Sequence, residues 1–360
     1  MDNITEFRIT QSEHTISDGY YELPFQLSEQ QQYASNAIVQ AINQHQPLLL
    51  YAVTGAGKTE MMFEGIRVAR QRGYNIAIVS PRVDVVVEIS LRIKAAFISE
   101  KIDVLHQSSQ QHYNGHFIIA TVHQLFRFKS HFDVIFIDEV DAFPLSMDPH
   151  LMNAIQLSSK QKHSHIFMTA TPPKSLIKRL STAQIITLPA RFHKHLLPVP
   201  RFSYFKLNVK HIQFKLKKML INQINANRYT LVFFNNIELM TETYKRYRYY
   251  FPDLICVSSK DALRFDKVQA LRNGEHTIVF TTTILERGFT MATLDVIVIN
   301  AHTFEQAALI QIAGRVGRKQ EAPTGNVVFM HEGVSIAMIQ AKREIKKMNR
   351  LGIQRGWVNA

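Results

Sequence analysis

The chain has 360 residues, 46% of them hydrophobic, which is enough apolar material for about two packed domains. Its 42 Lys and Arg against 29 Asp and Glu give a formal net charge of +13, which indicates a polyanionic partner, nucleic acid before membrane. The single cysteine, Cys256, excludes an internal disulfide and a four-cysteine zinc site. We see neither a secretory signal nor an apolar run near the roughly 18 residues of a membrane span, so we expect a cytoplasmic protein.

In chain order, residues 1–26 are polar with scattered aromatics and predict an N-terminal extension. Apolar runs typical of buried strands then alternate with helical stretches, at 48–53, 75–80, 103–106, 116–121, 133–138 and 165–170. A second set of such runs lies at 229–234, 254–257, 277–281, 295–300 and 325–330. Residues 191–206 follow neither period and predict a linker. The alternation predicts an α/β fold of two tandem parallel-sheet domains, 27–190 and 207–360.

A glycine-rich segment joins the first apolar run to the helical stretch after it, and consists of Thr54, Gly55, Ala56, Gly57, Lys58 and Thr59. Backbone N–H groups point outward at such a strand-to-helix turn, and glycine lets a phosphate approach them. Lys58 is then expected to reach the β- and γ-phosphates of ATP, and the Thr59 hydroxyl to bind Mg²⁺. The segment therefore predicts an ATP site.

Two further motifs complete this prediction. The apolar run 133–138 ends in Asp138, which we expect to hold Mg²⁺, and Glu139 follows it as the candidate general base. Far along the chain, Arg315 and Arg318 lie in the string Gln-x-x-Gly-Arg-x-Gly-Arg. A guanidinium from another domain stabilises the charge of a phosphoryl transition state, so we expect hydrolysis in an interdomain cleft that closes around ATP.

These motifs and the segments between them resemble a known family. The strings Ser-Pro-Arg-Val-Asp-Val (80–85), Ala-Thr-Val-His-Gln-Leu (120–125), Thr-Ala-Thr-Pro (169–172) and Thr-Thr-Thr-Ile-Leu-Glu-Arg-Gly (281–288) occur in the order of superfamily-two helicase motifs. Their residue sequences are similar to those of the ComFA-type competence DNA translocases, and the resemblance extends from about Leu27 to Gly352. The primosomal replication-restart helicase is a relative of this family. Ala52 replaces a glycine of the general phosphate-loop pattern, and this form is the one that superfamily two uses.

The resemblance implies two RecA-like domains around the ATP cleft. It also implies roles for individual residues. It assigns adenine reading to Gln31, with the neighbouring Gln30 as the alternative in the next register. It assigns a turn near the nucleotide to Gly288, and placement of the γ-phosphate and water to Gln311. It assigns coupling between the nucleotide and DNA to two residues, Thr169 and Thr171. Contacts with the nucleic-acid backbone are assigned to Pro81, Arg82, Thr121 and Thr282.

The resemblance also implies a function: an ATP-driven motor that pulls single-stranded transforming DNA into the cytoplasm. Its partners would be the competence membrane channel and other competence-operon proteins, at the inner face of the membrane. Many relatives carry an N-terminal four-cysteine zinc module, but residues 1–26 contain no cysteine, so we expect no zinc there. Two alternatives stay open: a replication-restart or RNA helicase that unwinds duplexes, and an ATP-gated nucleic-acid clamp that does not move processively.

Two basic stretches have alternative interpretations. The rings of 244–251 could stack on bases, but Met240, Tyr244 and Tyr247 share one helical face, which favours packing on the sheet with solvated cations. In 342–347, the apolar spacing of Met338 and Ile345 predicts a docked helix with a basic outer face that could contact phosphates.

Overall fold

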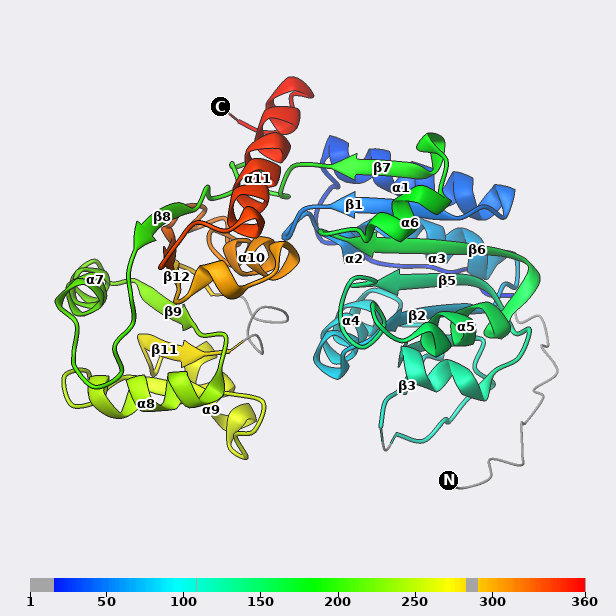
Figure 1. The fold of residues 1–360 in the computed structure, drawn as a ribbon. Coiled ribbons are helices and arrows are strands. Elements are labelled where there is room, and N and C mark those ends of the chain that lie inside the picture. The colour runs from blue at the N-terminus through cyan, green and yellow to red at the C-terminus, as the bar shows by residue number, and fades with distance from the viewer. Residues whose placement is uncertain (1–15, 108, 283–290, 360) are drawn as a thin grey trace. The chain divides into compact units, whose positions relative to one another are not determined.

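Parallel strands organise both halves of the chain, which confirms the predicted α/β class. The computed structural model describes residues 16–107, 109–282 and 291–359, and the chain divides between Leu188 and Pro189 into two units. Each unit contains one sheet with helices around it (Figure 1). Within the described residues, every ladder between the named strands is parallel.

The first sheet has the strand order β3-β4-β2-β5-β6-β1-β7. Its strands are β1 (Leu48–Ala52), β2 (Ile76–Ser80), β3 (Asp103–Leu105), β4 (Phe117–Thr121), β5 (Phe132–Asp138), β6 (Ser159–Thr169) and β7 (Ile185–Leu188). The helices of this unit are α1 (Glu29–Gln44), α2 (Lys58–Met61), α3 (Phe63–Gln71), α4 (Val83–Ala96), α5 (Pro149–Ser158) and α6 (Lys174–Arg179), with the 3₁₀ turns η1 (Val122–Arg127) and η2 (Thr182–Gln184).

Helices cover both faces of this sheet, and the central strands β2 and β5 are therefore mostly apolar and fully buried. All seven residues of β5 are buried. On one face, Leu151 and Ile155 of α5 pack with Val79 and Ile137. On the other side of the fold, α1 contacts α3, while α3 and α4 contact β2.

The described part of the N-terminal extension packs against the first unit. The Tyr21 ring lies 5.5 Å from that of Phe63 and 5.4 Å from that of Phe97, centroid to centroid. The Tyr21 hydroxyl donates to Glu64, and the Glu22 N–H donates to the Ala96 carbonyl. Residues 16–26 thus extend the apolar contacts of α3 and α4.

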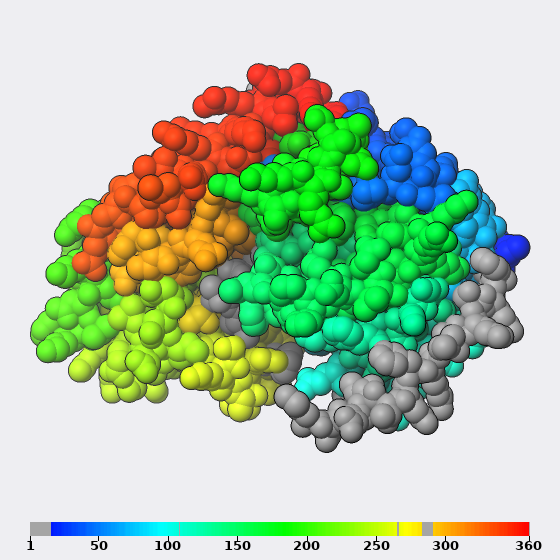
Figure 2. All heavy atoms as spheres, turned by 45° about the vertical axis from the view of Figure 1, so that its right-hand side comes forward, coloured from blue at the N-terminus to red at the C-terminus, as the bar shows by residue number. Residues whose placement is uncertain are grey.

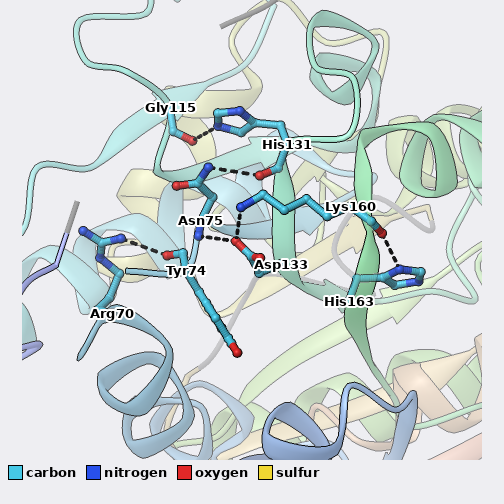
Figure 3. Close-up of polar contacts among 8 residues, drawn as sticks. All are labelled: Arg70, Tyr74, Asn75, Gly115, His131, Asp133, Lys160 and His163. Atoms are coloured by element: carbon cyan, nitrogen blue, oxygen red, sulfur yellow. Dashed lines mark hydrogen bonds and ion pairs between the residues drawn. The ribbon is translucent and has the colours of Figure 1, made fainter. Parts of the chain in front are cut away.

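A buried polar network joins the amino ends of β2, β5 and β6 (Figure 3). The Asp133 carboxylate accepts from the Asn75 N–H at 2.8 Å and forms an ion pair with Lys160 at 2.7 Å. The Asn75 amide donates to the His131 carbonyl, and the His131 ring donates in turn to the Gly115 carbonyl. Since a buried charge is costly without partners, these contacts explain how Asp133 is accommodated inside the unit.

The second sheet has the order β10-β11-β9-β12-β13-β8. Its strands are β8 (Arg201–Tyr204), β9 (Tyr229–Phe233), β10 (Ile255–Val257), β11 (Ile278–Thr281), β12 (Leu294–Val298) and β13 (Val327–His331). Its helices are α7 (Phe214–Asn225), α8 (Ile237–Tyr247), α9 (Arg264–Arg272), α10 (Gln306–Ala313) and α11 (Ile336–Gln354), with the 3₁₀ turn η4 (Ala301–Thr303). The C-terminal residues, orange to red, form the upper surface of this unit in Figure 2.

The two basic stretches pack largely as the helical spacing predicted. Met240 and Tyr247 of α8 are buried in the core of the second unit, but Tyr249 and Tyr250 beyond the helix are 81% and 56% exposed. In α11, the apolar residues Met338 and Ile345 are buried.

Two edge strands differ from the sequence prediction. The predicted linker 191–206 contains β8, which pairs with β13, and β7 lies in a stretch for which no strand was predicted. Each has only four residues, too few to establish a period, and prolines precede β8. In addition, β6 begins at Ser159 and not near 165, because its first residues are polar.

Candidate functional site

In the first unit, the predicted motif residues follow the carboxyl ends of neighbouring strands. The glycine-rich loop follows β1, Pro81 and Arg82 follow β2, Asp138 ends β5, and Thr169 ends β6. Because the strands are parallel, these ends lie on one edge of the sheet, where ligands of α/β proteins bind. Residues scattered over more than a hundred positions are therefore brought to one place.

The glycine-rich loop requires its glycines for backbone conformation and for space. Gly55 and Gly57 have φ of 83° and 79°, a region that other residues enter at a cost. A Cβ on Gly57 would lie 2.3 Å from Nε2 of Gln31. Helix α2 begins at the next residue, Lys58, as a phosphate-binding turn requires.

The Gln31 side chain forms a hydrogen bond with this loop. Its side-chain oxygen accepts from the Ser28 N–H at 2.9 Å in the capping box of α1, and its Nε2 donates to the Ala56 carbonyl at 3.2 Å. Both Gln31 and its neighbour Gln30 are buried. The adenine-reading role of Gln31 stays a prediction, but the structure attaches this side chain to the phosphate loop.

Lys58 and Asp138 meet at the centre of the site, where the Lys58 ammonium forms an ion pair with Asp138 Oδ1. The same carboxylate oxygen accepts from the backbone N–H of Glu139 at 3.0 Å. Glu139 has φ of 54°, a left-handed conformation that is sparsely populated by non-glycine residues and concentrates at functional sites. The left-handed turn therefore lies directly between the strand that ends in the metal-binding candidate and the loop that carries the base candidate.

Asp141 is a residue of the site for which the sequence motifs predicted no role. Its two carboxylate oxygens accept from the hydroxyls of Thr169 and Thr171, at 2.5 and 2.6 Å. The Thr171 N–H also donates to the Thr169 hydroxyl. Asp141 therefore ties the loop after β5, which carries Glu139, to the loop after β6.

The donor set fits Mg²⁺ together with ATP phosphates. Thr59 and Asp138 offer hydroxyl and carboxylate oxygens, the ligands that Mg²⁺ prefers, and Lys58 offers an ammonium beside them. A side chain on Gly57 would fill space next to the loop. When bound, Mg²⁺ would neutralise charge on the phosphates.

The predicted nucleic-acid contacts fall in two places. Pro81, Arg82 and Thr121 lie on the carboxyl edge of the first sheet, where the Arg82 guanidinium contacts Asp84. Thr282 follows β11 in the second unit and is buried. Gly288 lies outside the described residues. The assignment of DNA contacts to these residues stays a prediction.

The second unit carries the predicted arginines on a turn after α10. Gln311 lies within α10 and is buried, as is Arg315, whereas Arg318 is half-buried and donates from Nε to the Gly314 carbonyl at 2.9 Å. The chain thus presents two guanidiniums from one short segment, 314–318, which we call the arginine loop.

Comparison with known proteins defines the class. Residues 24–174 match the family model for the type III restriction enzyme res subunit, and residues 213–320 match the helicase conserved C-terminal domain. S. cerevisiae Dbp5 bound to RNA and ADP BeF3 superposes with a TM-score of 0.63 over 89% of this chain and 91% of its own, at 13% identity. RecG bound to a three-way DNA junction superposes with a TM-score of 0.65 over 93% of this chain and 47% of its own, at 17% identity. The matched family models and the fold are those of a superfamily-two helicase with two RecA-like domains.

Two curated relatives then give the family. The chain is 38% identical over 335 residues to competence protein ComFA of Bacillus subtilis (strain 168), covering 90% of this chain and 72% of the relative. It is 37% identical over 336 residues to ComFA of Streptococcus pneumoniae (strain ATCC BAA-255 / R6), covering 90% and 78%. The chain belongs to the ComFA family, which confirms the resemblance read from the motifs.

Family and fold together establish an enzyme of the ATPase or helicase type that uses ATP and Mg²⁺ and has a helicase-like role in competence. In the described residues, no helix is both long enough and apolar enough to span a membrane.

Proposed function

We propose that this protein is an ATP-driven single-stranded DNA translocase that moves transforming DNA into the cytoplasm. The observation that carries the proposal is that Lys58, Asp138, Glu139 and Asp141 with its two threonine partners lie on one sheet edge. Three of the predicted DNA contacts, Pro81, Arg82 and Thr121, follow strand ends on the same edge. A site that only bound ATP would need neither a base candidate nor a link of this kind to a second loop.

Hydrolysis in this proposal uses groups from both units. Lys58 neutralises the transferred phosphate, Glu139 takes the proton of the attacking water, and Arg315 and Arg318 stabilise the charge that develops on the phosphate oxygens. Gln311, on the helix that leads into the arginine loop, helps to place the water. Because the arginines belong to the second unit, each turnover would change how that unit engages the nucleotide and, through it, the DNA.

The distribution of charge supports a nucleic-acid partner. No Asp or Glu occurs between Asp148 and Glu238, while Lys and Arg recur throughout that stretch. A segment that carries only positive charge attracts the phosphates of a nucleic acid, and this attraction does not depend on the base sequence. We therefore expect sequence-tolerant binding whose log affinity falls with log salt by about 0.7 for each phosphate contacted on a single strand.

The deciding experiment measures movement along a strand. Wild-type protein, a biotinylated single-stranded oligonucleotide with bound streptavidin, and ATP are combined, and release of streptavidin is followed for biotin at each end. We expect release from one end only, and no release by Arg315→Ala or Arg318→Ala, although both variants should still bind ATP and DNA.

Two other outcomes would contradict the proposal. Duplex or RNA substrates that are unwound or that stimulate ATP hydrolysis more strongly than single-stranded DNA would favour a replication-restart or RNA helicase. Active ATP hydrolysis and ATP-dependent DNA binding without release from either end would favour a clamp. We further propose that the protein works at the inner face of the membrane with the competence channel and other competence-operon proteins, as its family suggests.

A further inference from the structure

The Arg191 side chain donates hydrogen bonds to three backbone carbonyls of the arginine loop. Its Nη1 donates to the carbonyls of Val316 and Gly317 at 2.7 and 2.5 Å, and its Nη2 donates to the Gly314 carbonyl at 3.1 Å. The side chain is only 1% exposed. These carbonyls follow the last turn of α10, where no helical N–H can satisfy them, and a cation is favourable at that end of a helix.

His193 adds a second contact to the same loop. Its Nε2 donates to the Gly317 carbonyl at 2.9 Å, and its Nδ1 accepts from the His195 N–H at 3.2 Å. The two contacts define a neutral imidazole with the proton on Nε2. Burial lowers the pKa of His193, which agrees with that form.

Arg191 shares a hydrogen-bond acceptor with Arg318, one of the predicted catalytic arginines. Arg318 Nε donates to the Gly314 carbonyl, the same oxygen that Arg191 Nη2 binds. Burial, and then the nearby Arg318, lower the pKa of Arg191 to about 9. Two cations so close repel one another, and a phosphate beside Arg318 would relieve that repulsion.

The segment that carries Arg191 is itself held firmly. Leu197 exchanges hydrogen bonds with the Asn349 side chain of α11, at 2.8 and 2.9 Å, and the Asn359 N–H donates to the Lys194 carbonyl. A Cβ on Gly317 would lie 2.2 Å from the Pro323 carbonyl oxygen, so the loop backbone has little freedom on its other side. Residues 191–197 thus join α11 to the arginine loop.

We propose that Arg191 and His193 are positioning residues that hold the arginine loop in the conformation in which Arg315 and Arg318 reach phosphate. The inference rests on the proposed role of these two arginines. It also assigns a function within the catalytic cycle to the start of the second unit, since Arg191 follows Leu188, the last residue of β7, by three positions.

The test is steady-state ATP hydrolysis with single-stranded DNA. Arg191→Lys keeps the charge but replaces the planar guanidinium, which donates from two separate nitrogens, with a single nitrogen on a different geometry, so kcat should fall about 10- to 100-fold while KM for ATP changes less than about 2-fold. His193→Leu should lower kcat about 3- to 10-fold, while His193→Gln, whose amide can donate in place of Nε2, should stay near wild type. Arg228→Lys is the matched control, because Arg228 of the same unit binds the Thr324 carbonyl and Asp295.

A double-mutant cycle separates positioning from mere stability. If Arg191 acts through the arginines, Arg191→Lys should lower kcat little further in an Arg318→Ala or Arg315→Ala background. Two results would overturn this inference but not the proposed role of the arginines. One is that the kcat losses of the single variants multiply in the double variant. The other is that folded Arg191→Lys keeps wild-type kcat while both alanine variants are impaired. Wild-type kcat in both alanine variants would instead overturn the proposed role of the arginines, and the inference with it. If Arg191→Lys does not fold, equal kcat of His193→Leu and His193→Gln would overturn the inference.

Discussion

The ammonium of Lys58 and the carboxylate of Asp138 form an ion pair at the carboxyl edge of the first sheet, although 80 positions separate them in the chain. The Asp138 side chain is 11% exposed and that of Lys58 is 21% exposed, so the pair lies in a partly dehydrated setting. A bound triphosphate and its metal would compete for these two groups, since each has an alternative partner of opposite charge there.

Replacing Lys58 with Ala should therefore abolish hydrolysis while single-stranded DNA binding is largely kept. Loss of a charge-stabilising group of this kind lowers kcat by about 10²- to 10³-fold. Phosphate-release kinetics and fluorescence anisotropy with labelled DNA measure the two properties in one preparation. Wild-type turnover would refute the assignment of the phosphate loop.

Glu139→Gln keeps the volume of the side chain and removes the base. ATP should still bind, but kcat should fall by about 10²- to 10⁴-fold, the contribution of a positioned general base. We expect the variant to remain on DNA after ATP is added, since the cycle stops before hydrolysis. DNA release at the wild-type rate upon ATP addition would show that Glu139 is not the base.

Asp141→Asn tests the link between the loops after β5 and β6. The variant removes the charged acceptor of the Thr169 and Thr171 hydroxyls, and hydrogen bonds to charged groups contribute about 1.5–3 kcal/mol each. We expect ATP hydrolysis without DNA to change little and its stimulation by DNA to fall about 5- to 100-fold. Thr169→Val with Thr171→Val should reproduce the effect. Unchanged stimulation in both variants would argue that this link does not couple DNA to hydrolysis.

Gly317→Ala should damage the arginine loop. Gly317 has φ of 68°, and its Cβ would meet the Pro323 carbonyl oxygen at 2.2 Å. We expect the free energy of unfolding of the second unit to fall by about 1–3 kcal/mol and kcat to fall as well. Gly333→Ala is the control, because a Cβ there meets nothing within 4 Å. Equal melting temperatures and equal kcat for the two variants would contradict the role given to Gly317.

Acid should destabilise the first unit through His165. Burial, then His163 and Arg179, lower the pKa of His165 to about 3. Below the ordinary value of about 6.5, the unfolded chain binds a proton that the folded chain does not, so stability falls as pH falls, by at most about 1.4 kcal/mol per pH unit.

Urea unfolding at pH 7.5 and 5.5 measures this dependence. His165→Gln, which can still donate to the Ser159 hydroxyl, should reduce the loss at pH 5.5, whereas replacement of the exposed His150 should not. A wild-type loss that His165→Gln leaves unchanged would exclude His165 as its cause.

Much of this protein could be predicted from its sequence alone. Mostly apolar runs such as 133–138 predict strands because a parallel strand that is covered on both faces buries nearly all of its side chains. The phosphate loop and the Asp138–Glu139 pair are visible because their chemistry needs neighbouring residues in the chain. For the same reason, local strings sufficed to indicate the ComFA family.

Only the tertiary structure revealed what depends on distant parts of the chain. The strands β7 and β8 are too short to show a period, and their partners in the sheet define them. Asp141 stands in the string Asp-Glu-Val-Asp (138–141), but its contacts with Thr169 and Thr171 arise only where two parallel strands end side by side. Arg191 lay in a predicted linker, and its contacts with the arginine loop span 123 to 126 positions. Hydrogen bonds to backbone carbonyls require geometry and not a particular partner side chain, so no residue pattern could have predicted them.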